Sequence, residues 1–182
     1  MMRECGDCQL CCKLLPVQSP LVDDKAAGQK CRYQKFGTGC TVYNTAKMPF
    51  ECGVWNCRWL VNDDTADLRR PDRSHYVIDI MPDFILVDGE PVEVVQIWVD
   101  PRHRDAHRDP ALRSYIERRA LENKVALIRY NAKDAFTLIA PVLCNDRQWH
   151  ELSGTSLGRS HTPHEVASAL GSFTVIAQGD ST

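Results

Sequence analysis

The sequence lacks the long apolar segments and the excess of basic charge that mark two broad classes of protein. No apolar run in the 182 residues approaches the roughly 20 that a membrane-spanning helix needs. Basic and acidic side chains are nearly balanced, 22 against 24, and the formal net charge is -2. Because non-specific affinity for nucleic acid comes from phosphate neutralisation by Lys and Arg, this balance argues against a nucleic-acid-binding protein. We expect neither a membrane nor a nucleic-acid partner, but an unknown protein or small molecule.

The first residues also lack the features of a secretion signal. The segment 1–8 has neither an apolar stretch nor a small-residue cleavage site. We therefore expect a cytoplasmic protein, in a compartment where thiols stay reduced.

Motifs for common catalytic sites are missing as well. The chain has no G-x-S-x-G sequence and no glycine-rich phosphate loop. His103 and His107 have i, i+4 spacing, but they stand among arginines before a predicted helix, and we interpret them as surface residues. His75 and His150 stand alone and are interpreted as structural or exposed. No catalytic residue is assigned, so the sequence leaves open whether the protein is an enzyme.

Cysteine, by contrast, is abundant, and it is concentrated at one end of the chain. Of nine cysteines, the following precede residue 60: Cys5, Cys8, Cys11, Cys12, Cys31, Cys40, Cys52 and Cys57. Thiols become useful in such numbers in a disulfide framework or around a soft metal. The absence of a secretion signal and the odd total favour metal over disulfides. The ninth, Cys144, is expected to be a small buried hydrophobic residue.

The spacing of the first four cysteines constrains how they can share a metal. On a helix, Cys5, Cys8 and Cys12 would share one face and Cys11 would point away, which makes Cys11 the candidate for a different role. Cys5 and Cys12 would also lie about 10 Å apart along the axis, too far for one zinc ion with sulfur bonds of about 2.3 Å. Either the backbone bends there or two sites share the segment. Eight thiolates would complete two four-thiolate zinc sites, or one 4Fe-4S cluster and one zinc site.

The order of the cysteines resembles a known family. The pattern Cys5-x2-Cys8-x2-Cys11-Cys12, then Cys31, Cys40-Thr41-Val42-Tyr43 and Pro49-x2-Cys52-x2-Trp55-x-Cys57 is similar to that of the CxxCxxCC, or YkgJ, family of zinc- or iron-chelating proteins. Family members often carry arginine before that proline and after that cysteine, where this chain has Met48 and Gly53. The resemblance implies that the eight cysteines bind zinc or iron, and it covers nothing beyond residue 60. A related pattern in flagellin lysine N-methylases implies an iron-sulfur enzyme as the alternative.

Aromatic residues interleave with these cysteines. They are Tyr33, Phe36, Phe50, Trp55 and Trp59. Aromatics beside basic residues can stack on bases, but a dry aromatic shell also controls solvent access to metal thiolates. We predict that these side chains pack around the metal. The Cys5-x2-Cys8 pair is likewise interpreted as metal ligands rather than as a thioredoxin-like redox pair, because it is not placed after a strand.

Hydrophobic patterning changes after residue 60. The segment 61–74 is polar and charged and predicts a linker. Runs rich in β-branched and aromatic residues then predict five strands, over 76–81, 84–87, 92–99, 125–130 and 135–140. Short polar breaks between the first three predict an antiparallel meander.

Two helices are predicted by their capping residues. Asp109 followed by Pro110 predicts a helix that runs to about Asn123. A capping box that begins at Thr162 predicts a short terminal helix that stops at Gly171.

The sequence therefore predicts an α+β fold in one compact unit. An N-terminal cysteine-rich metal-binding lobe (1–60) and a linker (61–74) precede an α+β region (75–182) with an antiparallel sheet, one packed helix and a short C-terminal helix. Three hypotheses remain for its function. They are a zinc-stabilised binding or adaptor module, an iron-sulfur enzyme or redox protein, and a thiol-disulfide protein.

Overall fold

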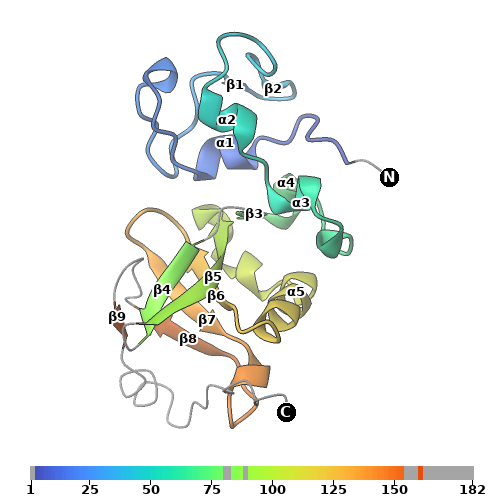
Figure 1. The fold of residues 1–182 in the computed structure, drawn as a ribbon. Coiled ribbons are helices and arrows are strands. Elements are labelled where there is room, and N and C mark those ends of the chain that lie inside the picture. Colours follow the sequence, from blue (N-terminus) through green and yellow to red (C-terminus); the bar gives the residue numbers. More distant parts are fainter. Residues whose placement is uncertain (1–2, 80–82, 88–89, 154–159, 162–182) are drawn as a thin grey trace, which may run out of the picture.

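The computed structural model describes residues 3–79, 83–87, 90–153 and 160–161. Short helices and two sheets confirm the α+β class (Figure 1). The cysteine-rich segment forms a lobe that lies beside the larger sheet. The predicted helix over 162–171 lies outside the described residues. None of the helices in the described ranges has the length and apolar character needed to cross a membrane.

The larger sheet is mixed, where an antiparallel sheet was predicted. Its strands are β3 (Tyr76–Ile78), β4 (Asp83–Val87), β5 (Glu90–Val99), β6 (Val125–Arg129), β7 (Ala135–Ile139), β8 (His150–Ser153) and β9 (Ser160–His161). Their order is β8-β7-β6-β5-β4-β9, and β3 also pairs with β5. Most pairs are antiparallel, but β5 with β6 and β4 with β9 are parallel. Parallel neighbours need a crossover, and the 3-10 helix η3 (Pro101–Arg108) and helix α5 (Pro110–Ala120) supply it between β5 and β6.

The predicted meander is wrong at its first turn. β3 and β4 both pair antiparallel with β5, β3 along Ile97–Val99 and β4 along Glu90–Val94. They therefore lie end to end along one edge of β5 and do not form a hairpin with each other. A short polar break is compatible with a hairpin or with an interrupted strand, and hydrophobic pattern alone does not distinguish the two.

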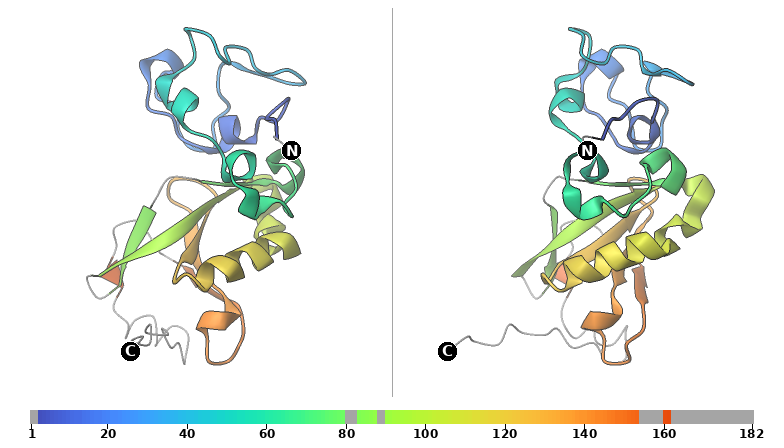
Figure 2. Two further views of the ribbon diagram at one scale, coloured as in Figure 1. Left: turned by 45° about the vertical axis from the view of Figure 1, so that its right-hand side comes forward. Right: turned by 90° about the vertical axis from the view of Figure 1, so that its right-hand side faces the viewer.

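Helix α5 confirms the helix predicted from its cap. The Asp109 side chain accepts a hydrogen bond of 2.9 Å from the backbone N–H of Ala111, and Pro110 occupies the first turn. The apolar residues predicted for one face are all buried: Leu112, Tyr115, Ile116 and Ala120. They pack against one face of the sheet (Figure 2).

The cysteine-rich lobe packs against the opposite face of the sheet. Successive residues of a strand point to opposite faces. Accordingly, Tyr76 and Ile78 of β3 join the core beneath α5, whereas Val77, between them, packs with the lobe. Trp98 of β5 also packs with the lobe, in a cluster with Leu10 and Leu14 of helix α1 (Leu10–Leu14). The lobe thus takes part of its apolar core from the sheet.

Polar contacts reinforce this junction. Lys13 of α1 pairs with Asp100, which follows β5 and is almost fully buried. The indole N–H of Trp55 donates to Asp79, just after β3, at 2.7 Å. Burial alone would raise the pKa of Asp100, but hydrogen bonds from Lys13 and from the backbone N–H of Arg102 lower it below its usual value.

The segment predicted as a linker is folded. It contains the end of helix α3 (Arg58–Val61), the 3-10 helix η2 (Asp63–Thr65) and helix α4 (Pro71–Ser74). Thr65 is fully buried, and its hydroxyl accepts a hydrogen bond from Arg3 at 2.8 Å. Polar composition suggested a solvated linker, but the segment forms short helices, and Thr65 within it is buried with hydrogen-bond partners of its own.

The Lys13–Asp100 pair generates a pH-dependent prediction. Asp100→Asn keeps the acceptor for Arg102 but removes the charge, so we expect a loss of roughly 1 to 3 kcal/mol of unfolding free energy at pH 7. Because the folded-state pKa of Asp100 is lowered, its contribution is present above the unfolded value of about 3.9 and is lost as pH falls through the folded value. Urea unfolding from pH 7 to pH 3 measures this difference.

The control for this measurement is Asp105→Asn, whose side chain is 86% exposed and pairs only with Arg108 in the same helix. Its effect should be close to zero, since exposed ion pairs contribute little. Equal stability of wild type and Asp100→Asn at pH 7 would contradict the role of the pair.

Candidate metal centre

The first four cysteines do not lie on one continuous helix. Helix α1 begins at Leu10, and Cys5 and Cys8 precede it in a turn closed by a hydrogen bond of 3.0 Å from Cys8 N–H to the Cys5 carbonyl. Gly6 adopts a φ of +54° inside this turn. The backbone therefore bends before the helix, which is one of the two arrangements that the spacing allowed.

The later cysteines come from four separate pieces of chain. Cys40 ends the small hairpin of β1 (Gln34–Lys35) and β2 (Gly39–Cys40), while Cys52 lies on helix α2 (Phe50–Val54). Cys57 immediately precedes α3. Cys31 is tied back to the first segment, because its backbone N–H donates to the Cys12 carbonyl at 3.2 Å.

Four cysteines form what we call the inner group, beside the sheet. They are Cys5, Cys8, Cys11 and Cys57. Cys8 and Cys57 are both 8% exposed, and Cys5 and Cys11 pack against the same apolar cluster. The pKa of Cys5 is raised because its thiol donates a hydrogen bond to Cys8, because it is buried, and because Cys57 lies near enough for its charge to act. The same hydrogen bond lowers the pKa of Cys8 to about 7.

The other four form what we call the outer group. They are Cys12, Cys31, Cys40 and Cys52. Burial, and then the charges of the other three members, raise the pKa of Cys52 to about 11. Burial also raises the pKa of Cys40, with contributions from the charges of Cys12 and Cys31. Thiols within each group therefore act on one another, and Cys12 also acts on Cys5 of the inner group.

Cys11 and Cys12 connect the two groups. The Cys11 thiol donates a hydrogen bond to Cys12, which raises the pKa of Cys11 and lowers that of Cys12. After Cys12, the thiols that act on Cys11 are Cys5 and Cys57 of the inner group. The charge of Cys12 acts on Cys5 of the inner group and on Cys40 and Cys52 of the outer group, so Cys12 lies between the two groups. The different role expected for Cys11 stays a prediction.

Backbone N–H groups face several of these sulfurs. The pKa of Cys8 is lowered first by Cys5, and then by the backbone N–H of Leu10. Burial raises the pKa of Cys40 and Cys57, but the N–H groups of Val42 and Leu60 act in the opposite direction. Such hydrogen bonds stabilise thiolates and orient them as metal ligands.

A buried lysine beside the outer group was not predicted from the sequence. Lys25 is 5% exposed. Its ammonium group has three N–H donors and lies within hydrogen-bond distance of four backbone carbonyls, those of Lys13, Leu15, Ala26 and Gln29. Burial lowers the pKa of Lys25, and the charges of Cys31 and Cys12 oppose that shift. Nothing in the local sequence distinguishes this lysine from a surface residue, because its carbonyl partners exist only in the folded loop.

The sulfur atoms are near one another but are not drawn together to coordination distance. In the described part of the chain, no three of these sulfurs lie within 4.8 Å of one another. Tetrahedral zinc with sulfur bonds of about 2.3 Å would hold its sulfurs about 3.8 Å apart. The groups therefore have the composition of four-thiolate sites in a more open arrangement.

The aromatic shell was predicted only in part. Trp55 and Trp59 are half-buried and pack against the inner group, as expected. Phe36 and Phe50 are 94% and 76% exposed, so their predicted packing around the metal is wrong. Both lie in short loop or helix segments at the lobe surface, where the apolar periodicity that fixes side-chain direction is absent.

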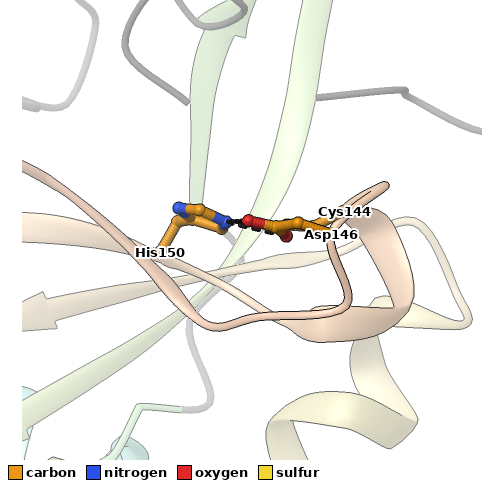
Figure 3. A group of neighbouring side chains, drawn as sticks. All are labelled: Cys144, Asp146 and His150. Carbon is orange, nitrogen blue, oxygen red and sulfur yellow. Dashed lines mark hydrogen bonds and ion pairs between the residues drawn. The ribbon is translucent and has the colours of Figure 1, made fainter. Parts of the chain in front are cut away.

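A second type of candidate site lies in the sheet region. Ligand atoms of Cys144, Asp146 and His150 lie within 4.8 Å of one another (Figure 3). The Nε2 atom of His150 is 2.8 Å and 3.0 Å from the two carboxylate oxygens of Asp146. Burial, and then the charge of Asp146, raises the pKa of Cys144. Cys144 is buried as expected, but the Cys-x-Asp-x3-His spacing that brings it to His150 was missed.

His107 is a correction to the sequence analysis. It is 4% exposed, and its Nδ1 atom lies 2.6 Å from the carbonyl oxygen of Arg104. It forms part of the wall of a cavity of about 530 Å³, where Glu151 lies 3.3 Å from its Nε2 atom. Both ring nitrogens have polar partners, which makes its burial possible. The sequence analysis expected a surface residue because arginines surround it in the chain.

Searches of known protein families, curated proteins and solved structures found no match to this chain. The functional assignment therefore depends on the residues of the chain itself.

Close contact between the first turn and the hairpin generates a second prediction. Gly39 has a φ of +92°, and a Cβ there would lie 3.0 Å from the carbonyl oxygen of Gly6. Gly39→Ala should therefore push the two cysteine-bearing loops apart and lower the metal content of the purified protein. Gly37→Ala is the matched control, because Gly37 also has a positive φ but open space around it. It should cost about 1 to 2 kcal/mol for the left-handed backbone alone.

Metal analysis and thermal unfolding of both variants measure the difference. Equal metal content and equal stability in the two would show that the contact between Gly39 and Gly6 does not matter.

Proposed function

We propose that this chain is a metal-binding protein in which the inner and outer groups each form one metal centre. The observation that supports this proposal best is the division of the eight cysteines into two sets of four, one beside the sheet and one beside Lys25. Four thiolates are the complete ligand set of a structural zinc ion and also of an iron-sulfur cluster. The resemblance of residues 5–57 to the YkgJ family supports the same assignment.

Zinc suits both groups on electrostatic grounds. Four thiolates around one divalent ion carry a net charge of about -2. Beside the outer group, the buried ammonium of Lys25 offsets part of that charge. Beside the inner group, backbone N–H groups such as that of Leu10 face the sulfurs. Fully ligated zinc is usually structural, so this assignment makes the lobe a binding or adaptor module for a protein or small-molecule partner.

An iron-sulfur cluster is the second candidate, and it concerns the inner group. Cys8 and Cys57 are buried, and Trp55 and Trp59 cover the group, which excludes water. The open spacing of the sulfurs suits a cluster, since its four thiolates surround several iron and sulfide atoms rather than one ion. In this case the protein would be a redox protein or an iron-sulfur enzyme.

A pair of variants tests the division into two groups. Cys57→Ser should remove the inner centre and Cys31→Ser the outer one, because each centre loses one of its four ligands. Each variant should therefore lose about one centre and retain the other. Asn56→Ser, next to Cys57, is the control and should retain both. Metal and acid-labile sulfide content per chain, measured after anaerobic purification, separate the outcomes.

The pattern of loss also separates zinc from iron. Loss of iron, sulfide and visible colour in Cys57→Ser alone would assign a cluster to the inner group. Unchanged metal content in both cysteine variants would contradict the proposal. Disulfide-bonded cysteines in metal-free wild-type protein would support the thiol-disulfide alternative.

A further inference from the structure

The segment that carries Cys144, Asp146 and His150 is held in place by its own backbone. The 3-10 helix η4 (Pro141–Leu143) precedes Cys144, whose N–H donates to the Pro141 carbonyl at 3.1 Å. The carboxylate of Asp146 accepts the N–H of Gln148 at 3.0 Å, and this interaction closes the loop. His150 is the first residue of β8 and lies opposite Ile139 of β7. All three donors are thus presented by one ordered turn.

We propose that Cys144, Asp146 and His150 form a further metal site, independent of the cysteine lobe, that binds a divalent transition-metal ion such as Zn²⁺ with three protein ligands. In the described part of the chain, no other set of three potential ligand atoms lies within 4.8 Å. Tetrahedral zinc would hold a sulfur, a nitrogen and an oxygen ligand about 3.3 to 3.6 Å apart. The site therefore needs shifts of about 1 Å in side chains that are already neighbours.

The donor set specifies the class of metal. Thiolate and imidazole ligands favour zinc and its transition-metal neighbours over magnesium or calcium, which prefer oxygen ligands. One thiolate and one carboxylate also neutralise the charge of a divalent ion, so the site needs no further counter-ion. The metal would replace the hydrogen bonds that Asp146 accepts from His150 and that Ala140 accepts from the Cys144 thiol.

Three protein ligands leave the fourth position of the metal open to water. That is the arrangement of catalytic rather than structural zinc sites. Cys144 is only 5% exposed and anchors the site in the core. The Asp146 side chain is 41% exposed, so the open position faces solvent.

The site is also remote from the eight N-terminal cysteines. η4 and β8 lie at the end of the sheet away from the cysteine-rich lobe in each view (Figures 1 and 2). Metal at this turn would therefore add to the content of the lobe and would bind independently of it.

Zinc titration of the full chain tests the proposal. Wild-type protein saturated with Zn²⁺ should hold about one ion more per chain than Cys144→Ser or His150→Asn. Loss of a ligand should weaken binding at this site by more than about 100-fold, since even loss of an outer hydrogen bond to a ligand costs 10- to 100-fold. Cys144 is buried, so Cys144→Ser could lower zinc content by misfolding. His150→Asn replaces a partly exposed side chain and tests the site without that risk. Asn145→Ala, in the same exposed loop, should bind as wild type does.

Cobalt substitution identifies which ion is lost. Co²⁺ at the proposed site should give a spectrum with weaker sulfur-to-metal charge-transfer bands than a four-thiolate centre gives, and His150→Asn should remove only that component. Cys31→Ser should leave it in place, so failure here and failure of the lobe centres can be told apart. Equal zinc content in wild type, Cys144→Ser and His150→Asn would overturn the proposal and leave an ion pair that stabilises the turn.

Discussion

The crowding of eight thiols into one small lobe is the constraint on which the rest of this structure depends. Thiols this close cannot all ionise without a compensating charge, because each thiolate raises the pKa of its neighbours. Backbone N–H groups and the buried ammonium of Lys25 supply part of that compensation. In the proposed function, a metal ion in each group would supply the remainder, since binding would replace thiol protons with a shared divalent charge. Folding of the lobe and metal binding would then be coupled.

The lobe is nevertheless anchored by more than its sulfurs. Alternation along β3 turns Val77 toward the lobe and its neighbours toward α5, so one strand contributes to both cores. Asp79 and Asp100, just beyond the strands, accept hydrogen bonds from Trp55 and Lys13 of the lobe. Cys8 and Cys57 share an apolar cluster with Trp98. The inner group thus packs partly against the sheet, whereas the outer group comes from α1, α2 and the hairpin region of the lobe and is more exposed.

Sequence patterns predicted the parts of this molecule that depend on local physics. The Asp109 cap, the buried face of α5 and the positions of the five main strands all follow from propensity and periodicity. The antiparallel pairing of β4 with β5 was predicted, but the partner of β3 was not, because the connection between β3 and β4 could be a hairpin or an interrupted strand. The linker was misread for a related reason: Thr65 is buried through partners such as Arg3, which is distant in sequence.

The candidate sites, too, were predicted from the sequence only where local spacing was enough. Cysteine spacing alone identified the eight candidate ligands, but the single helix considered for the first four does not form, because Cys5 and Cys8 precede α1. The closeness of Cys12 to Cys40 and Cys52 depends on the β1–β2 hairpin and α2, and the role of Lys25 depends on the folded loop around it. The cluster of Cys144, Asp146 and His150 was not predicted from the sequence, since its three donors meet because of the backbone between β7 and β8.

The most direct test of the central claim is the metal, acid-labile sulfide and reactive-thiol content of the full chain, purified anaerobically without chelator. Metal binding by the eight cysteines predicts at least two metal centres per chain and thiols that react only after the metal is removed. Zinc without sulfide would assign two structural centres, and iron with sulfide would assign a cluster. Metal-free protein with freely reactive thiols or with disulfides would contradict the account.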